Sequence, residues 1–224
     1  MNAKRITRVM VALGAPLILT AGLATTSALL GSGAAGATST SASTGTLGLT
    51  GGSLDIVSPS SLGWSTTLSG ANQHMVDPTE ADQVMTVTDA SGSAAGWHVT
   101  VAATTFTAGT KTLADSGVLQ LNGDPTSEAT TTRPATACVA LTTCTNSTDA
   151  SSPVVSYPVS VTTAASTPTA VSILSTKAAT GMGAIVIGGG ATASGGVGWW
   201  MNILASTLAG SYTSTVTVAV VTAP

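Results

Sequence analysis

The stretch Tyr212-Thr-Ser-Thr-Val-Thr-Val-Ala-Val-Val221, close to the C-terminus, separates its side chains into two alternating sets. Successive side chains of a β-strand point to opposite faces of the sheet. One face would therefore carry Tyr212, Ser214, Val216, Val218 and Val220, and the other would carry Thr213, Thr215, Thr217, Ala219 and Val221. An apolar face opposite a hydroxyl-bearing face predicts a half-buried strand.

Short runs of the same kind recur along the chain, separated by Gly, Pro, Asn and Asp. Many short strands with such turns predict an all-β fold, an antiparallel β-sandwich with Greek-key-like connections. No amphipathic stretch of useful helical length accompanies them. The predicted strands are Thr46–Leu49, Leu54–Val57, Val84–Thr88, Trp97–Ala102, Val118–Leu121, Val154–Val161, Val171–Leu174, Ala184–Ile187, Trp199–Leu204 and Tyr212–Val221.

The N-terminus has the layout of an export signal. Three basic residues precede the apolar run Val9–Leu23, and Ala35-Gly36-Ala37 forms a small-residue cleavage site. The alternative is a retained membrane anchor, but about 15 apolar residues fall short of the roughly 20 that a spanning helix needs. We therefore predict a signal peptide over residues 1–37, cleaved on export. A flexible leader over 38–44 and one domain over 45–224 follow.

Charge limits the range of partners. Charged residues make up 7% of the chain, against about 25% in ordinary domains. Cleavage after Ala37 would remove three of the six basic residues and no acid, which leaves three basic and nine acidic residues and a net charge of −6. Nucleic-acid binding depends on clustered Lys and Arg, so nucleic acid is excluded as a partner.

Residues 123–152 are polar, and we predict that they form a long loop excursion from the sheet. Both cysteines lie in this excursion. Cys138 and Cys144 are separated by five residues. Two cysteines in an exported chain favour a disulfide. A redox or metal pair is the alternative, but the C-x-x-C spacing and a neighbouring histidine are missing.

Side chains suited to catalysis or metal binding are sparse. His74 is predicted in a polar loop, and His98 is predicted to point away from the face of its strand neighbours. Asp77, Glu80 and Asp82 cluster without the D-x-D-x-D-G pattern of a calcium loop, so a solvated acidic loop is favoured. We predict no enzyme activity, no cofactor and no metal. A glycan-cleaving enzyme remains a remote alternative that lacks an acid/base pair.

The aromatic residues are few, and each admits two interpretations. A buried tryptophan can anchor a core otherwise built from small residues, which is favoured for Trp97. Exposed Trp and Tyr can instead stack on sugar rings. Trp199 and Trp200 are the best candidates, because adjacent strand residues face opposite sides. One of the two must leave the core face unless both faces of the sheet are covered.

Several segments together resemble the WxL surface domain. They are Gly45–Leu49, Val84–Asp89 with Gly96–Val101, and the closing segment Gly198–Pro224. The likeness covers nearly the whole predicted domain in the same order. Two departures are visible: Val99 stands where the first motif has Leu, and Val218 stands where the second motif has Trp.

The resemblance implies an exported Gram-positive surface protein that attaches non-covalently to the cell wall. Its implied ligand is peptidoglycan or another wall glycan, and its implied partner is a membrane-anchored WxL-associated protein. The alternative is a structural or adhesion subunit that binds another surface protein by β-strand addition. The predicted ligand-binding residues are Trp97, Val99, Trp199, Trp200, Tyr212, Val218 and Val220.

Overall fold

The structure is a computed structural model. It describes residues 45–128, 132–139, 144, 155–189 and 195–222. The predicted signal peptide and leader lie outside the described residues, as does much of the predicted excursion. The chain divides into two units, with the boundary between Thr50 and Gly51. All of the strands named below belong to the second unit.

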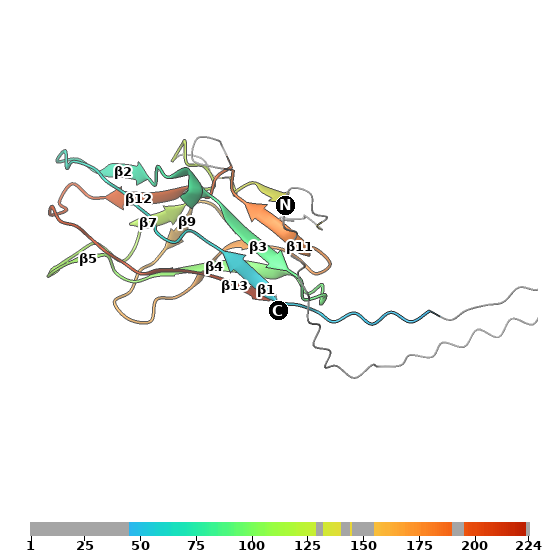
Figure 1. The fold of residues 1–224 in the computed structure, drawn as a ribbon. Coiled ribbons are helices and arrows are strands. Elements are labelled where there is room, and N and C mark those ends of the chain that lie inside the picture. The colour runs from blue at the N-terminus through green and yellow to red at the C-terminus, as the bar shows by residue number, and fades with distance from the viewer. Residues whose placement is uncertain (1–44, 129–131, 140–143, 145–154, 190–194, 223–224) are drawn as a thin grey trace, which may run out of the picture. The chain divides into compact units, whose positions relative to one another are not determined.

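The described part of the chain contains thirteen strands and one short 3-10 helix, joined by loops (Figure 1). They are β1 (Leu54–Val57), β2 (Gln73–Val76), η1 (Glu80–Gln83), β3 (Met85–Asp89), β4 (Trp97–Ala103), β5 (Thr107–Ala108), β6 (Lys111–Thr112), β7 (Leu119–Leu121), β8 (Thr136–Cys138), β9 (Val159–Val161), β10 (Val171–Ser175), β11 (Gly183–Ile187), β12 (Trp199–Ile203) and β13 (Val216–Thr222).

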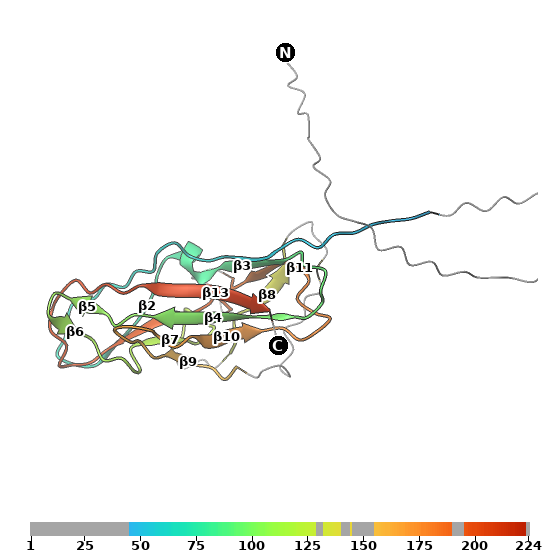
Figure 2. The ribbon, with the colours of Figure 1, turned by 90° about the horizontal axis from the view of Figure 1, so that it is seen from below.

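The strands form three antiparallel sheets and one hairpin. The sheet orders are β1-β3-β11-β8, β10-β4-β13 and β2-β12-β7-β9, and β5 pairs with β6. Figure 2 shows β13, β4 and β10 side by side, with the β5–β6 hairpin at the end of the unit away from the end of β13. The predicted all-β, antiparallel sandwich is confirmed.

The core lies between the sheets and takes side chains from all three. β4 shows why its sequence makes a strand: Trp97, Val99, Val101 and Ala103 are buried and the residues between them are partly exposed. Residues 212–221 follow the predicted alternation: the even-numbered residues are half-buried, and Thr213, Thr215, Thr217 and Val221 are exposed. Ala219 departs from it and is half-buried. Buried Leu119, Ile185 and Trp199 join the same cluster from the other two sheets.

Most predicted strands are present within a residue or two, but some segments differ. The last predicted strand, Tyr212–Val221, begins only at Val216 as β13. Residues 45–50 form no strand, so the strand predicted over Thr46–Leu49 is wrong. The predicted run ending at Val161 is reduced to β9, because Pro158 cannot donate to a strand ladder. β8 lies within the predicted excursion and pairs with β11. β2 was not predicted, and it places His74 on a strand rather than in a loop.

No helix in the described ranges is long and apolar enough to cross a membrane.

Candidate functional site

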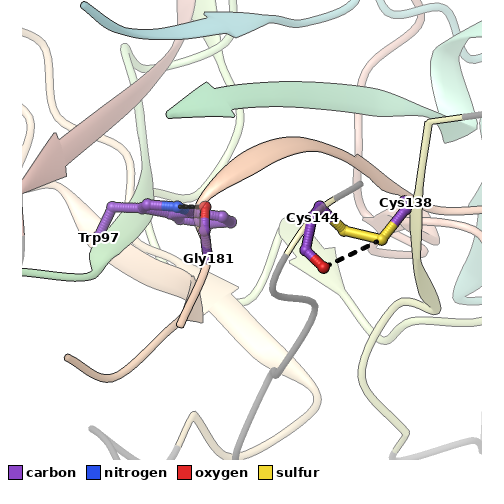
Figure 3. The surroundings of a disulfide bond; sticks show 4 residues. All are labelled: Trp97, Cys138, Cys144 and Gly181. Atoms are coloured by element: carbon purple, nitrogen blue, oxygen red, sulfur yellow. Dashed lines mark hydrogen bonds between the residues drawn. A yellow bond between two sulfur atoms is a disulfide. The ribbon is translucent and has the colours of Figure 1, made fainter. Parts of the chain in front are cut away.

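Trp97 lies inside the core, where its polar atoms are satisfied. Its side chain has no exposed surface, and its Nε1–H donates to the carbonyl oxygen of Gly181 at 2.8 Å (Figure 3). A Cβ atom at Gly181 would lie 2.6 Å from that Nε1, and the φ of Gly181 is +83°. The indole can therefore approach this backbone only because residue 181 is glycine.

Trp199 and Trp200 are both buried, because both faces of β12 are covered. The Nε1–H of Trp199 donates to the carbonyl oxygen of Asp82 at 2.9 Å. On the opposite face, the Nε1–H of Trp200 donates to Asn122 Oδ1 and to the carbonyl oxygen of Asp124, both at 3.0 Å. The buried segment after β7 thus covers Trp200, and neither indole presents a face for stacking.

The structure brings together the two segments that carry the motif resemblance. Val220 of β13 is directly opposite Val99 of β4, and Val218 is opposite Val101. Val99 is fully buried, while Val218 and Val220 are half-buried against the core. These residues form a packed cross-strand ladder, and Val218 also lines the edge of a cavity described below.

Among the predicted site residues that the structure describes, half-buried Tyr212 lines both of two neighbouring cavities, whereas half-buried Val218 and buried Trp199 line the smaller one alone. A larger cavity of about 720 Å³ and a smaller one of about 490 Å³ are both lined by Trp64, Phe106 and Tyr212. We call these three residues the aromatic ridge, and the two cavities with the ridge between them the aromatic groove. Both volumes fall within the range of small-ligand sites.

Two long connections and the core supply the walls of the groove. The segment before β2 and the segment between β12 and β13 face each other across it, and the latter turns at the same end as the β5–β6 hairpin (Figure 1). Backbone hydrogen bonds between Thr107 and Thr213, at 2.9 and 3.0 Å, join that segment to β5. The floor is apolar, formed by Met75, Met201 and Ile203.

The ridge side chains are held in place from behind. The Nε1–H of Trp64 donates to the carbonyl oxygen of Trp199 at 3.1 Å. The Trp64 and Phe106 rings pack edge to face, with centroids 6.2 Å apart. The Tyr212 hydroxyl donates to the carbonyl oxygen of Leu208 at 2.8 Å. Rings fixed in this way lose little further freedom when a ligand binds.

Charge is absent from the described lining of the groove, which combines apolar side chains with hydroxyl groups. Serine and threonine form much of the rim: Ser60, Ser61, Ser65, Thr66, Thr67, Thr207, Ser211, Thr213, Ser214 and Thr215. Such a lining suits an uncharged ligand that has both an apolar face and hydroxyl groups.

The acidic residues have structural positions outside the groove. The predicted solvated acidic loop is wrong for Asp77, which is fully buried, whereas Glu80 is exposed as predicted. Asp77 accepts hydrogen bonds from the backbone N–H of Gly63 at 2.7 Å and of Thr79 at 2.8 Å. It thereby fixes the segment that leads to Trp64. Burial raises the pKa of the Asp82 carboxyl, and the nearby Asp77 charge raises it further.

Asp115 accepts hydrogen bonds from the hydroxyl groups of Thr105, at 2.5 Å, and Thr163, at 2.7 Å. These bonds stabilise the charged carboxylate and lower its pKa.

His74 contacts Asn202 Oδ1 at 2.8 Å and Glu128 Oε1 at 2.5 Å through Nδ1. In the described part of the chain, no three acidic, His or Cys side chains gather as metal ligands would.

The cysteines lie in the predicted excursion, at the end of β8. Their Sγ atoms are 1.88 Å apart and their Cα atoms 5.6 Å apart, in agreement with the predicted disulfide (Figure 3). The bond closes a short loop at the edge of the β11 sheet. It lies on a different sheet from the strands that floor the groove.

Sequence reasoning missed Trp64 and Phe106 as site residues. Neither residue belongs to a motif, and they come from segments 42 positions apart in the sequence. A partial signal was available, since Trp64 lies in a run rich in Ser and Thr rather than in a predicted strand.

The comparisons with known proteins agree with this architecture. A sequence model of the family described as WxL domain surface cell wall-binding matches residues 49–224. Searches of curated proteins and of solved structures give no significant match. The matched range covers most of the chain and all of its strands. The chain therefore belongs to the WxL family of surface cell wall-binding domains, which is a binding family rather than an enzyme family.

Proposed function

We propose that this protein is exported through its N-terminal signal peptide and held at the outside of the cell by non-covalent binding to peptidoglycan. Family membership supports association with the cell wall in general. The observation that carries the finer proposal is the aromatic groove, which is open and hydroxyl-rimmed and has no charged residue in its described lining.

The groove is suited to retention rather than to catalysis. Among the described residues, every buried side-chain nitrogen or oxygen has a hydrogen-bond partner. An acid/base pair would need two ionisable groups facing the ligand, and the described lining offers none. Binding by stacking and hydroxyl contacts requires no such groups. A wall-binding module therefore fits the groove better than a hydrolase does.

Sedimentation with purified peptidoglycan tests the proposal. We expect the purified protein to pellet with peptidoglycan and Tyr212→Ala to remain largely in the supernatant. Val57→Ala is the matched control, because Val57 is 68% exposed and does not line the groove. Far-UV circular dichroism of each variant checks that the fold is retained. Failure of the wild-type protein to pellet would reject peptidoglycan as the ligand.

A second candidate function is supported by the edge of the β4 sheet. We propose that β13 can accept a strand from another surface protein, such as a membrane-anchored partner. β13 has seven residues without charge or proline, and among the strands that the structure describes its ladder partner is β4 alone. β1 lies beside it without ladder bonds. Long uncharged edges favour strand addition.

Val221 offers a direct test, because it is 40% exposed on this edge strand. We expect Val221→Lys to abolish complex formation with a partner in size-exclusion chromatography with light scattering, while binding to peptidoglycan persists. A partner complex that forms equally well with the lysine variant would argue against the β13 edge.

A further inference from the structure

We infer that the aromatic groove binds the glycan strand of the wall, by its uncharged N-acetylhexosamine rings, in preference to the stem peptides. This inference rests on the proposed peptidoglycan binding and adds which part of the polymer is recognised and where. One wall of the groove belongs to the closing segment that carries the resemblance, whereas Trp64 and Phe106 lie outside the resembling segments.

The chemistry of a hexosamine ring matches the surfaces on the two sides of the aromatic ridge. One face of such a ring presents C–H groups, which pack on an indole or phenol face, while its edge carries hydroxyl and amide groups. Trp64 and Tyr212 supply half-buried aromatic surface. Ser65, Thr66 and Ser211 are exposed and surround that surface with hydroxyl groups. An apolar floor with a polar rim is typical of sites that orient an amphipathic ligand.

The lack of charge argues against the stem peptides as the primary ligand. Stem peptides carry free carboxylates and, in many walls, an amine. Moving such groups against a lining without counter-charges costs free energy, because the charge loses water and gains no partner. Lys111 is outside the lining, and its Nζ donates to the carbonyl oxygen of the lining residue Ala209 at 2.6 Å. N-acetylhexosamine rings carry no charge and avoid this cost.

The division into two cavities points to a polymer rather than to a single sugar. The larger cavity extends from the ridge towards Leu68 and Leu208, and the smaller one extends towards Pro59 and Val218. A glycan strand lying across the ridge would place successive rings in the two cavities. Several weak contacts would then add along one chain, and binding would strengthen with oligomer length.

A matched pair of leucines makes the inference testable. Leu208 lines the larger cavity and is 61% exposed, whereas Leu204, four residues earlier in the same connection, is 51% exposed and outside the lining. Because both leucine side chains are exposed, we expect the fold to tolerate a polar side chain at either position. Leu208→Asp places a carboxylate in the lining of the groove, and Leu204→Asp places the same charge outside it.

Isothermal titration calorimetry with two probes measures the preference. The probes are a soluble N-acetylglucosamine hexamer and a free stem pentapeptide. We expect the purified protein to bind the hexamer with an affinity independent of salt, because no ion pair is involved. Leu208→Asp should weaken that binding by at least about tenfold, equivalent to about 1.4 kcal/mol. Leu204→Asp should stay within about twofold.

The outcomes separate this inference from the proposed function. If wild-type protein does not pellet with peptidoglycan, the proposed function fails and the inference fails with it. If wild-type protein pellets but binds the pentapeptide instead of the hexamer, the function stands and the glycan assignment is overturned. If it binds the hexamer and both aspartate variants behave alike, the location in the groove is overturned.

Discussion

Replacing Trp97 with alanine tests whether this residue stabilises the fold from within the core. Its side chain is fully buried and its Nε1–H donates to Gly181. Truncating a buried tryptophan costs about 3–5 kcal/mol, and leaving the Gly181 carbonyl unpaired costs about 1–3 kcal/mol. We therefore expect the free energy of unfolding to fall by about 5 kcal/mol, comparable to the total of about 5–15 kcal/mol for a typical domain.

Urea denaturation followed by far-UV circular dichroism measures this loss. His98→Ala is the matched control, because His98 lies next along β4 and points away from the core; we expect a change of about 0.5 kcal/mol or less. If the alanine variant does not fold, Trp97→Phe keeps most of the apolar volume and should lose about 1–3 kcal/mol through the missing donor.

Two results would refute the reasoning. A loss below about 1 kcal/mol in Trp97→Ala would mean that the side chain is not packed as described. A folded variant of unchanged stability that no longer pellets with peptidoglycan would mean that Trp97 contacts the ligand, and not only the core.

Three further predictions concern single features of the structure. Replacing Cys138 and Cys144 with serine should lower the free energy of unfolding in urea by about 2 kcal/mol, because the disulfide closes a short loop. The lowered pKa of the Asp115 carboxyl stabilises the fold above the ordinary Asp pKa of about 3.9, and this contribution disappears as the pH falls through the folded-state value. Melting temperatures measured across this range should therefore fall less steeply for Asp115→Asn than for the wild type. Gly198→Ala should destabilise far more than Gly109→Ala in thermal unfolding. Both glycines have positive φ, which costs alanine about 1–2 kcal/mol, but a Cβ atom at 198 would also lie 2.2 Å from a neighbouring side-chain oxygen.

The alternation rule predicted the strands well where one face of the strand is buried. β4 and β13 have long runs of β-branched residues, and their observed faces follow the predicted ones. β2 and β8 were missed because their sequences, Gln73–Val76 and Thr136–Cys138, carry no apolar period. They are strands because β2 pairs with β12 and β8 pairs with β11, and a local sequence pattern does not reveal such distant pairing.

The candidate site was predicted only in part. Tyr212 was proposed from its place in the closing segment, and the structure puts it on the groove. The Trp199–Trp200 argument correctly required one indole to leave the core face or both faces to be covered. The second condition holds, because the segment that includes Asn122 and Asp124 covers Trp200. Trp64 and Phe106 become neighbours only through long connections, so no local pattern identified them.

The sequence by itself determined the class of fold, the strand faces, the cysteine pairing and the scarcity of charge, because each depends on residue type and short-range spacing. It also carried the family resemblance. Only the tertiary structure decided which aromatic side chains remain available to a ligand. The exposure of a side chain depends on which distant segments of the chain cover it. The segment after β7 covers Trp200, whereas the two connections that face each other across the groove leave Trp64 and Tyr212 half-buried beside it.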